Sequence, residues 1–189
     1  QGRGVAVGYR LNGGGSGSSA TINVNADGTI NLITGSVDIG GTRTSIAMQA
    51  AEILGIPIEN VNPSVVDTDS VGYTGGTNGS RITFDTGRAA INASRDVITQ
   101  MSSRAAILWE VQNEDVEFNG GVFLCTKNPQ DRLTFSELAG KLMDTGGPVT
   151  CSASDKQGGV GAQLAGHIVD VEVDQDTGKV EILRYTAVQ

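Results

Sequence analysis

The stretch Thr34-Gly-Ser-Val-Asp-Ile-Gly-Gly-Thr-Arg-Thr44 decides the fold, because it ends an alternating apolar pattern with two glycines and opens directly into an amphipathic helix. Glycine permits unusual φ angles and close backbone approach, and the first helical turn leaves N–H groups without intrahelical partners. Together with the positive end of the helix dipole, these donors can hold a phosphate or pyrophosphate. For a single loop of this kind, a tight turn capped by a threonine is the commoner interpretation.

The residues on either side predict a strand-to-helix junction. Residues 20–25 and 29–33 alternate apolar and polar side chains around the turn at residues 26–28, which is typical of a β-hairpin. Downstream, four apolar residues share one helical face, and Gly55 followed by Pro57 predicts the end of that helix. The apolar residues are Ile46, Ala50, Ile53 and Leu54.

A second loop with the same chemistry follows. Residues 60–67 predict a short strand, and residues 72–81, Gly-Tyr-Thr-Gly-Gly-Thr-Asn-Gly-Ser-Arg, are again rich in glycine and hydroxyl groups. A long amphipathic helix is then predicted over residues 89–109. Its predicted core stripe is Ala90, Ala93, Val97, Met101, Ala105 and Leu108. Two such loops suit an extended ligand such as a dinucleotide-sized cofactor, and ordinary connections in a glycine-rich domain are the alternative.

A third glycine run, residues 12–19, follows the apolar stretch at residues 5–9, but a strand pattern comes after it. The fingerprint of a Rossmann fold requires a helix at that point and an acidic residue about 20 positions later, so the sequence does not support that fold. It also lacks the glycine–lysine pattern of phosphate-loop NTPases. We expect this run to be a flexible loop.

The composition excludes several classes of function. The 189 residues carry a formal net charge of -8, and their 13 Lys and Arg residues are scattered, whereas nucleic-acid surfaces need basic stripes. We therefore expect no nucleic-acid partner. No run of about 18 apolar residues predicts a membrane span, and no secretion signal begins the chain. The expected protein is soluble and cytoplasmic, without a membrane partner.

The cysteines and the histidine do not indicate a metal site. Cys125 and Cys151 lie apart from each other and from His167, which favours two reduced thiols over a disulfide or a metal centre. His167 lies in a strand-like run, so we expect a structural or surface histidine rather than a catalytic base.

The second half of the chain predicts short strands and one more helix. Residues 116–118 and 122–125 are joined through Asn119-Gly120-Gly121, a strong hairpin signal. Thr134 and Glu137 have the spacing of a capping box at a helix start. The apolar positions expected to pack inward are Leu138, Leu142 and Met143, and Gly146 is expected to end the helix.

The last residues alternate as strands over 168–173 and 180–185, and the strand at the end leads us to expect that the native polypeptide continues. Together these patterns predict an α+β fold (mixed α/β), with mixed sheets, β-hairpins and two helices that follow Gly-rich loops. We expect residues 1–112 to carry two loop–helix units that hold a cofactor. Residues 113–189 are expected to carry the β-hairpin, the third helix and the terminal strands.

Three motifs, in this order and spacing, resemble a known family. They are residues 37–57, which begin Val37-Asp-Ile-Gly-Gly-Thr42, then Asp67-Thr-Asp69, then Gly75-Gly-Thr-Asn-Gly-Ser-Arg81. They resemble the molybdopterin-binding large subunit of the molybdenum hydroxylases, the family of xanthine dehydrogenase, aldehyde oxidase and carbon monoxide dehydrogenase. The resemblance extends over most of the chain. It implies a fragment of that subunit's molybdenum-binding domain, with a molybdenum–molybdopterin cofactor, with or without a cytosine dinucleotide extension.

The resemblance also implies which residues contact the cofactor. The Gly-Gln-Gly triplet of the family corresponds here to Gly40-Gly41-Thr42, which keeps the backbone donors and lacks the glutamine amide. In the second loop the implied contacts are Thr77, Asn78, Gly79, Ser80 and Thr83, with Arg81 as a weaker candidate. No residue of this chain is expected to bind the metal directly. None is expected to act in catalysis either, because the glutamate base of the family lies beyond the strand where this chain ends.

The implied parent protein is an oxidoreductase that hydroxylates an electron-poor carbon of a small molecule with oxygen from water. Its electrons leave through iron–sulfur clusters and FAD on partner domains or subunits. We expect this chain to supply part of the cofactor site, to need the remaining domains of the large subunit, and to be inactive alone. A non-catalytic binding or structural module that reuses the fold is the second hypothesis, and an independent nucleotide-binding protein is the third.

Overall fold

The computed structural model describes residues 1–11, 15–67, 69–156 and 161–189, which form two compact units. The smaller unit contains residues 1–13 and 159–189, and the larger contains residues 14–158. The boundary predicted between residues 112 and 113 lies inside the larger unit. Of the glycine run predicted to be a flexible loop, residues 12–14 lie outside the described residues.

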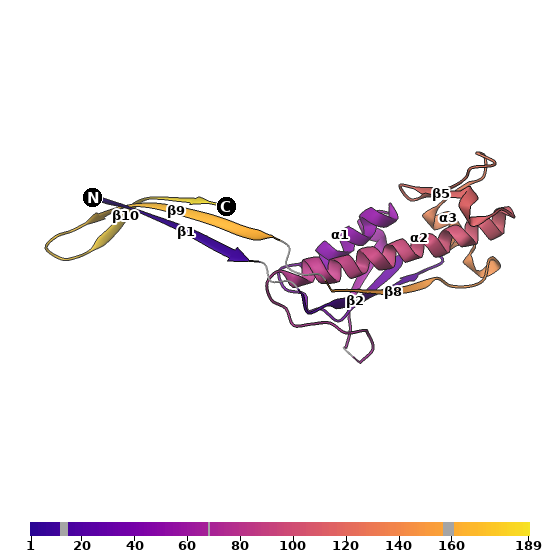
Figure 1. The fold of residues 1–189 in the computed structure, drawn as a ribbon, viewed down its shortest axis with the longest axis horizontal. Helices are drawn as coiled ribbons and strands as arrows, with labels where there is room; N and C mark the ends of the chain where they lie inside the picture. The colour runs from indigo at the N-terminus through magenta and orange to yellow at the C-terminus, as the bar shows by residue number, and fades with distance from the viewer. Residues whose placement is uncertain (12–14, 68, 157–160) are drawn as a thin grey trace. The chain divides into compact units, whose positions relative to one another are not determined.

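The smaller unit is an antiparallel sheet of three strands in the order β1-β9-β10 (Figure 1). Its strands are β1 (Gly2–Leu11), β9 (Ala162–Val173) and β10 (Val180–Val188). The two terminal strands predicted from the alternation are therefore confirmed. In the turn between them, Asp174 Oδ1 accepts the N–H groups of Asp176 and Thr177 at 2.9 and 2.8 Å.

The larger unit is built on a mixed four-stranded sheet in the order β4-β3-β2-β8. Its strands are β2 (Ser18–Val24), β3 (Ile30–Thr34), β4 (Val61–Val65) and β8 (Thr150–Asp155). Only β3 and β4 run parallel. Alternating burial along β2 and β3 leaves one face for the core, and this pattern confirms the predicted β-hairpin. The mixed sheet with its helices confirms the α+β class.

Two helices cover the buried face of this sheet (Figure 1). Helix α1 (Thr42–Leu54) ends as predicted at Gly55, which adopts the left-handed conformation with φ 60°. Helix α2 (Gly87–Trp109) follows a π-helical turn at Ile82–Thr86, and a 3-10 turn at Ile58–Asn60 leads into β4.

The predicted core stripe of α2 is confirmed except at its last position. Leu108 is 37% exposed, whereas Met101 and Ala105 are fully buried and Trp109 packs against the core. The buried stripe therefore continues in steps of four residues to Trp109, and Leu108 lies about 100° to its side on the helix.

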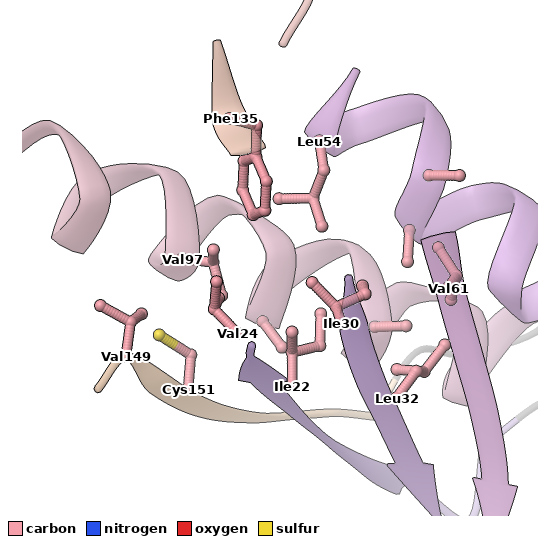
Figure 2. Close-up of a cluster of buried hydrophobic side chains, with 14 of the residues drawn as sticks. Ile22, Val24, Ile30, Leu32, Leu54, Val61, Val97, Phe135, Val149 and Cys151 are labelled. Carbon is pink, nitrogen blue, oxygen red and sulfur yellow. The ribbon is translucent and has the colours of Figure 1, made fainter. Parts of the chain in front are cut away.

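The core lies between the sheet and these helices (Figure 2). Figure 2 shows Ile22 and Ile30 of the sheet, with Val97 of α2, Leu54 of α1 and Phe135 gathered above the strands. Each fully buried aliphatic or aromatic side chain of this kind contributes roughly 1.5–3 kcal/mol. Because the two strands that lead to the Gly-rich loops and both helices share this core, it fixes the positions from which the loops start and end.

A second small sheet extends the larger unit. It contains β5 (Val116–Asn119), β6 (Val122–Cys125) and β7 (Arg132–Thr134), preceded by a 3-10 turn at Asn113–Asp115. Asn119 pairs with Val122, so Gly120 and Gly121, with φ 53° and 85°, form the two-residue turn. This arrangement confirms the predicted hairpin, because its favoured turn needs positive φ at both central residues.

The third helix is shorter than predicted. Helix α3 (Phe135–Ala139) has the predicted capping box between Thr134 and Glu137, but it ends before Gly140 and is followed by a 3-10 turn at Leu142–Asp144. The prediction that Met143 packs inward was wrong, since Met143 is 73% exposed while Leu138 and Leu142 are buried. The break after Ala139 changes the direction of the side chains that follow.

The thiol of Cys151 is buried in the core, and Cys125 is also buried and free. Burial, with a smaller contribution from Asp96, raises the pKa of Cys151 from 9.0 to about 11. In the unfolded chain the thiol ionises near its ordinary pKa. Its contribution to stability is therefore present below pH 9 and lost as the pH rises toward 11.

We accordingly expect the urea midpoint of the chain to fall between pH 9 and 11, and to fall less in a Cys151→Ala variant. Native Cys151 should also react slowly with iodoacetamide at pH 8, because the thiolate is the nucleophile. Rapid labelling of Cys151 in the folded chain at that pH would contradict the assignment.

Candidate functional site

Both Gly-rich loops leave the same edge of the mixed sheet. Strands β3 and β4 are parallel neighbours with Thr34 opposite Val65, and the Val66 N–H donates to the Thr34 carbonyl at 3.0 Å. The loop at residues 35–41 and the loop at residues 66–81 therefore start side by side. This is the edge, at the carboxyl ends of parallel strands, where open α/β sheets bind ligands.

The segments that contain these loops also touch further along. The hydroxyls of Ser36 and Thr86 are 2.7 Å apart, and both residues are buried. From α1, Gln49 Nε2 donates to the Thr83 carbonyl at 3.3 Å, so the first helix contacts the π-helical turn that follows the second loop. These contacts connect the two predicted loop–helix segments.

The two loops end with the same backbone conformation. Gly40 and Gly41 have φ 66° and 79°, and Gly79 and Ser80 have φ 51° and 60°. For Ser80, a residue with a Cβ, the left-handed region costs about 1–2 kcal/mol. Such strain and π-helical turns both concentrate at functional sites. The backbone therefore points to the starts of α1 and α2 as the places to look for a ligand.

The carboxylate of Asp38, in the loop before α1, occupies the first turn of this helix. Asp38 Oδ1 accepts the Arg43 N–H at 3.0 Å, and its other oxygen lies 3.3 Å from Arg43 Nε. Thr42 is not the N-cap; Gly41 occupies that position, and as a glycine it has no side chain to cap the helix. A ligand oxyanion at this turn would therefore lie next to a carboxylate. The backbone of Gly40 and Gly41 stays open, because no atom lies within 4 Å of a Cβ built on either.

The second loop presents polar groups to solvent. Thr77, Asn78 and Ser80 are exposed, and Gly79 and Thr83 are partly exposed. Their hydroxyl, amide and backbone groups are of the kind that hydrogen-bond a polar ligand.

The side chain of Arg81, in contrast, points into the interior of the protein. Its side chain is completely buried, and its guanidinium donates from Nε to the Gly76 carbonyl at 2.9 Å and from Nη1 to the Gly17 carbonyl at 2.8 Å. Nη2 donates to the Gly75 carbonyl. In this structure Arg81 holds the second loop from inside the protein.

Asp85 completes this buried arrangement, and the sequence analysis did not single it out. Its side chain is 1% exposed, its Oδ2 lies 3.8 Å from Arg81 Nη1, and the same oxygen accepts the Gly15 N–H at 3.1 Å. Within the described residues, its Oδ1 has no hydrogen-bond partner. The spacing of an Arg and an Asp four residues apart on a helix start was the available signal. Part of the third glycine run, residues 15–18, is thereby fixed to the second loop.

His167 is on β9 of the smaller unit, where its Nδ1 lies 3.1 Å from the Tyr185 hydroxyl.

Along the described ranges of the chain, no helix has both the length and the apolar character needed to cross a membrane.

Comparison with known proteins gives a consistent match. The family profile of the molybdopterin cofactor-binding domain matches residues 1–189. The chain is 31% identical to the aldehyde oxidoreductase molybdenum-binding subunit PaoC of Escherichia coli K12, covering 99% of this chain and 24% of that subunit. It is 27% identical to the 6-hydroxypseudooxynicotine dehydrogenase complex subunit gamma of Paenarthrobacter nicotinovorans, with coverages of 97% and 24%.

Solved structures share the fold. The Cu,Mo-CO dehydrogenase in its carbon monoxide reduced state matches with a TM-score of 0.79 and 24% identity over 98% of this chain and 26% of that chain. Quinoline 2-oxidoreductase from Pseudomonas putida 86 matches with a TM-score of 0.75, 24% identity and the same coverages. The chain spans about a quarter of the length of the relatives it matches.

Proposed function

The chain belongs to the molybdopterin cofactor-binding domain family, and we propose that it forms part of the cofactor cradle of a molybdenum hydroxylase similar to xanthine dehydrogenase. The observation that carries this proposal is the common origin of the two Gly-rich loops at the ends of β3 and β4. Because the chain spans about a quarter of its relatives, the activity would belong to a longer parent protein.

The residues of both loops fit a polar ligand rich in oxygen and nitrogen. On one side, Gly40, Gly41 and Thr42 offer open backbone with positive φ at both glycines. On the other side, exposed Thr77, Asn78 and Ser80 and partly exposed Gly79 and Thr83 offer donors. In the proposal these residues bind and orient molybdopterin, with or without a dinucleotide extension, while buried Arg81 acts by fixing the loop.

The bound cofactor would supply the redox chemistry, hydroxylation of an electron-poor carbon with oxygen from water. We assign no proton transfer to a residue of this chain. The remaining large-subunit domains would provide the base and the substrate pocket, and iron–sulfur and FAD subunits or domains would accept the electrons. The named relatives that are subunits of larger complexes support such partners.

Molybdenum and pterin content of the purified full-length parent protein, with its partner subunits, tests the proposal. We expect both to be present, and we expect a Ser80→Glu variant to retain the cofactor with at least roughly tenfold lower affinity, since like charges in an interface cost several kcal/mol. Thr99→Glu, on an exposed position of α2, is the matched control and should leave the metal content unchanged.

An active parent enzyme without molybdenum would end the proposal. A stable parent protein with neither metal nor activity would favour the second candidate, a non-catalytic module of the same fold. The carboxylate of Asp38 at the first turn of α1 is the observation that favours this candidate.

A further inference from the structure

The larger unit contains a hollow whose residues the cofactor proposal does not use. Its volume is about 450 Å³, and it lies where the start of β2 meets the end of β8 and the loop before α2. Five of its side chains carry a hydroxyl group and one carries an ammonium group. The side chains that carry them are Ser16, Ser18, Ser19, Tyr73, Ser154 and Lys156.

Once the ion pair of Asp155 with Arg88 is counted, one positive charge, that of Lys156, remains in this hollow. Its single carboxylate, Asp155, is already paired, because its Oδ2 lies 2.5 Å from Arg88 Nε. The ammonium of Lys156 takes part in no ion pair with the described residues. A ligand here would therefore meet hydroxyl donors and one uncompensated cation, which suits an anion and disfavours a metal ion.

Hydrogen bonds to buried residues hold the wall of the hollow in place. The Gly17 carbonyl accepts both Arg81 Nη1, at 2.8 Å, and the Gly75 N–H, at 3.2 Å. The buried hydroxyl of Ser18 is 2.6 Å from Thr86 Oγ1. A Cβ on Gly17 would lie 3.6 Å from the Lys156 Cβ, so the segment that bears the lysine packs directly on this glycine. A wall fixed before binding lowers the entropic cost of taking up a ligand.

We propose that this hollow binds a phosphate-class oxyanion. Lys156 is the charge partner, and the hydroxyls of Ser16, Ser19 and Tyr73 donate hydrogen bonds to the anion. The anion is either the phosphate end of a larger ligand or a free phosphate-class ion, and the chemistry that recognises it is the same. The site shares no residue with the assigned cofactor contacts, so it can be tested separately from them.

Titration of the 189-residue chain with inorganic pyrophosphate in a calorimeter tests the site. We expect saturable binding, and we expect Lys156→Gln to raise the Kd about tenfold, the order of one charge-assisted hydrogen bond. Asp155→Asn should lower the Kd, because it removes the nearby carboxylate and frees Arg88. Lys141→Gln, which removes the same charge at an exposed position away from the hollow, should change the Kd by less than about twofold.

Absence of pyrophosphate binding to the wild-type chain would overturn the site, and so would equal effects of Lys156→Gln and Lys141→Gln. Molybdenum content of the parent protein carrying Lys156→Gln then identifies the source of the anion. A loss of metal indicates the phosphate end of the cofactor, and unchanged metal with weakened pyrophosphate binding indicates a free ion. Since the titration needs no molybdenum, its failure would leave the proposed cofactor role standing.

Discussion

Replacing Arg81 with glutamine should lower the free energy of unfolding of the chain by about 3–5 kcal/mol, because it leaves a buried charge without its partner. The Arg81 side chain has no exposed surface, and the Asp85 side chain beside it is 1% exposed. The substitution also removes hydrogen bonds to the carbonyls of Gly17, Gly75 and Gly76. Urea unfolding followed by circular dichroism measures the loss.

Arg88→Gln is the matched control. Arg88 lies seven positions further along and also pairs with an aspartate, Asp155, but its side chain is 46% exposed. Exposed ion pairs contribute about 0–1 kcal/mol, so this variant should unfold almost like the wild type. Equal losses in the two variants would show that Arg81 does not hold the loops together.

Replacing Gly55 with alanine should cost about 2–5 kcal/mol, the sum of left-handed backbone strain and of overpacking. Gly55 has φ +60°, and a Cβ there would lie 2.2 Å from the Gly121 backbone nitrogen. Backbone atoms cannot rotate away as a side chain can. The end of α1 and the β5–β6 turn would have to separate, which the urea midpoint should record.

Gly120→Ala separates the two terms of that cost. Gly120 has a similar φ of +53°, but no atom lies within 4 Å of a Cβ built on it. Only the strain remains, so we expect a loss of about 1–2 kcal/mol. If Gly55→Ala is no more harmful than Gly120→Ala, the close contact between α1 and the hairpin is not important for stability.

Local signals in the sequence were sufficient for much of the fold. The β2–β3 hairpin, the end of α1 at Gly55 and the capping box at Thr134 each depend on a few neighbouring residues whose preferences agree with the final structure. The failures at Leu108 and Met143 have different causes. At the end of α2 the buried stripe continues to Trp109, four residues after Ala105, and leaves Leu108 to its side. Met143 follows the break after Ala139, which the helical pattern did not predict.

The candidate site was less accessible to sequence reasoning. Both loops were recognised from their composition, but the parallel pairing of β3 with β4, which places them together, joins strands separated by a helix. Periodicity also does not distinguish an arginine that faces a ligand from one that faces the interior. Arg81 has the composition of a ligand contact and the burial of a core residue.

A crystal structure of the full-length parent protein loaded with its cofactor tests most directly whether the two Gly-rich loops form one site. We expect a single molybdopterin to lie within hydrogen-bond distance of residues 40–42 and, on its other side, of residues 77–83. A cofactor that contacts only one of these loops, or that lies away from the ends of β3 and β4, would contradict the proposed cradle.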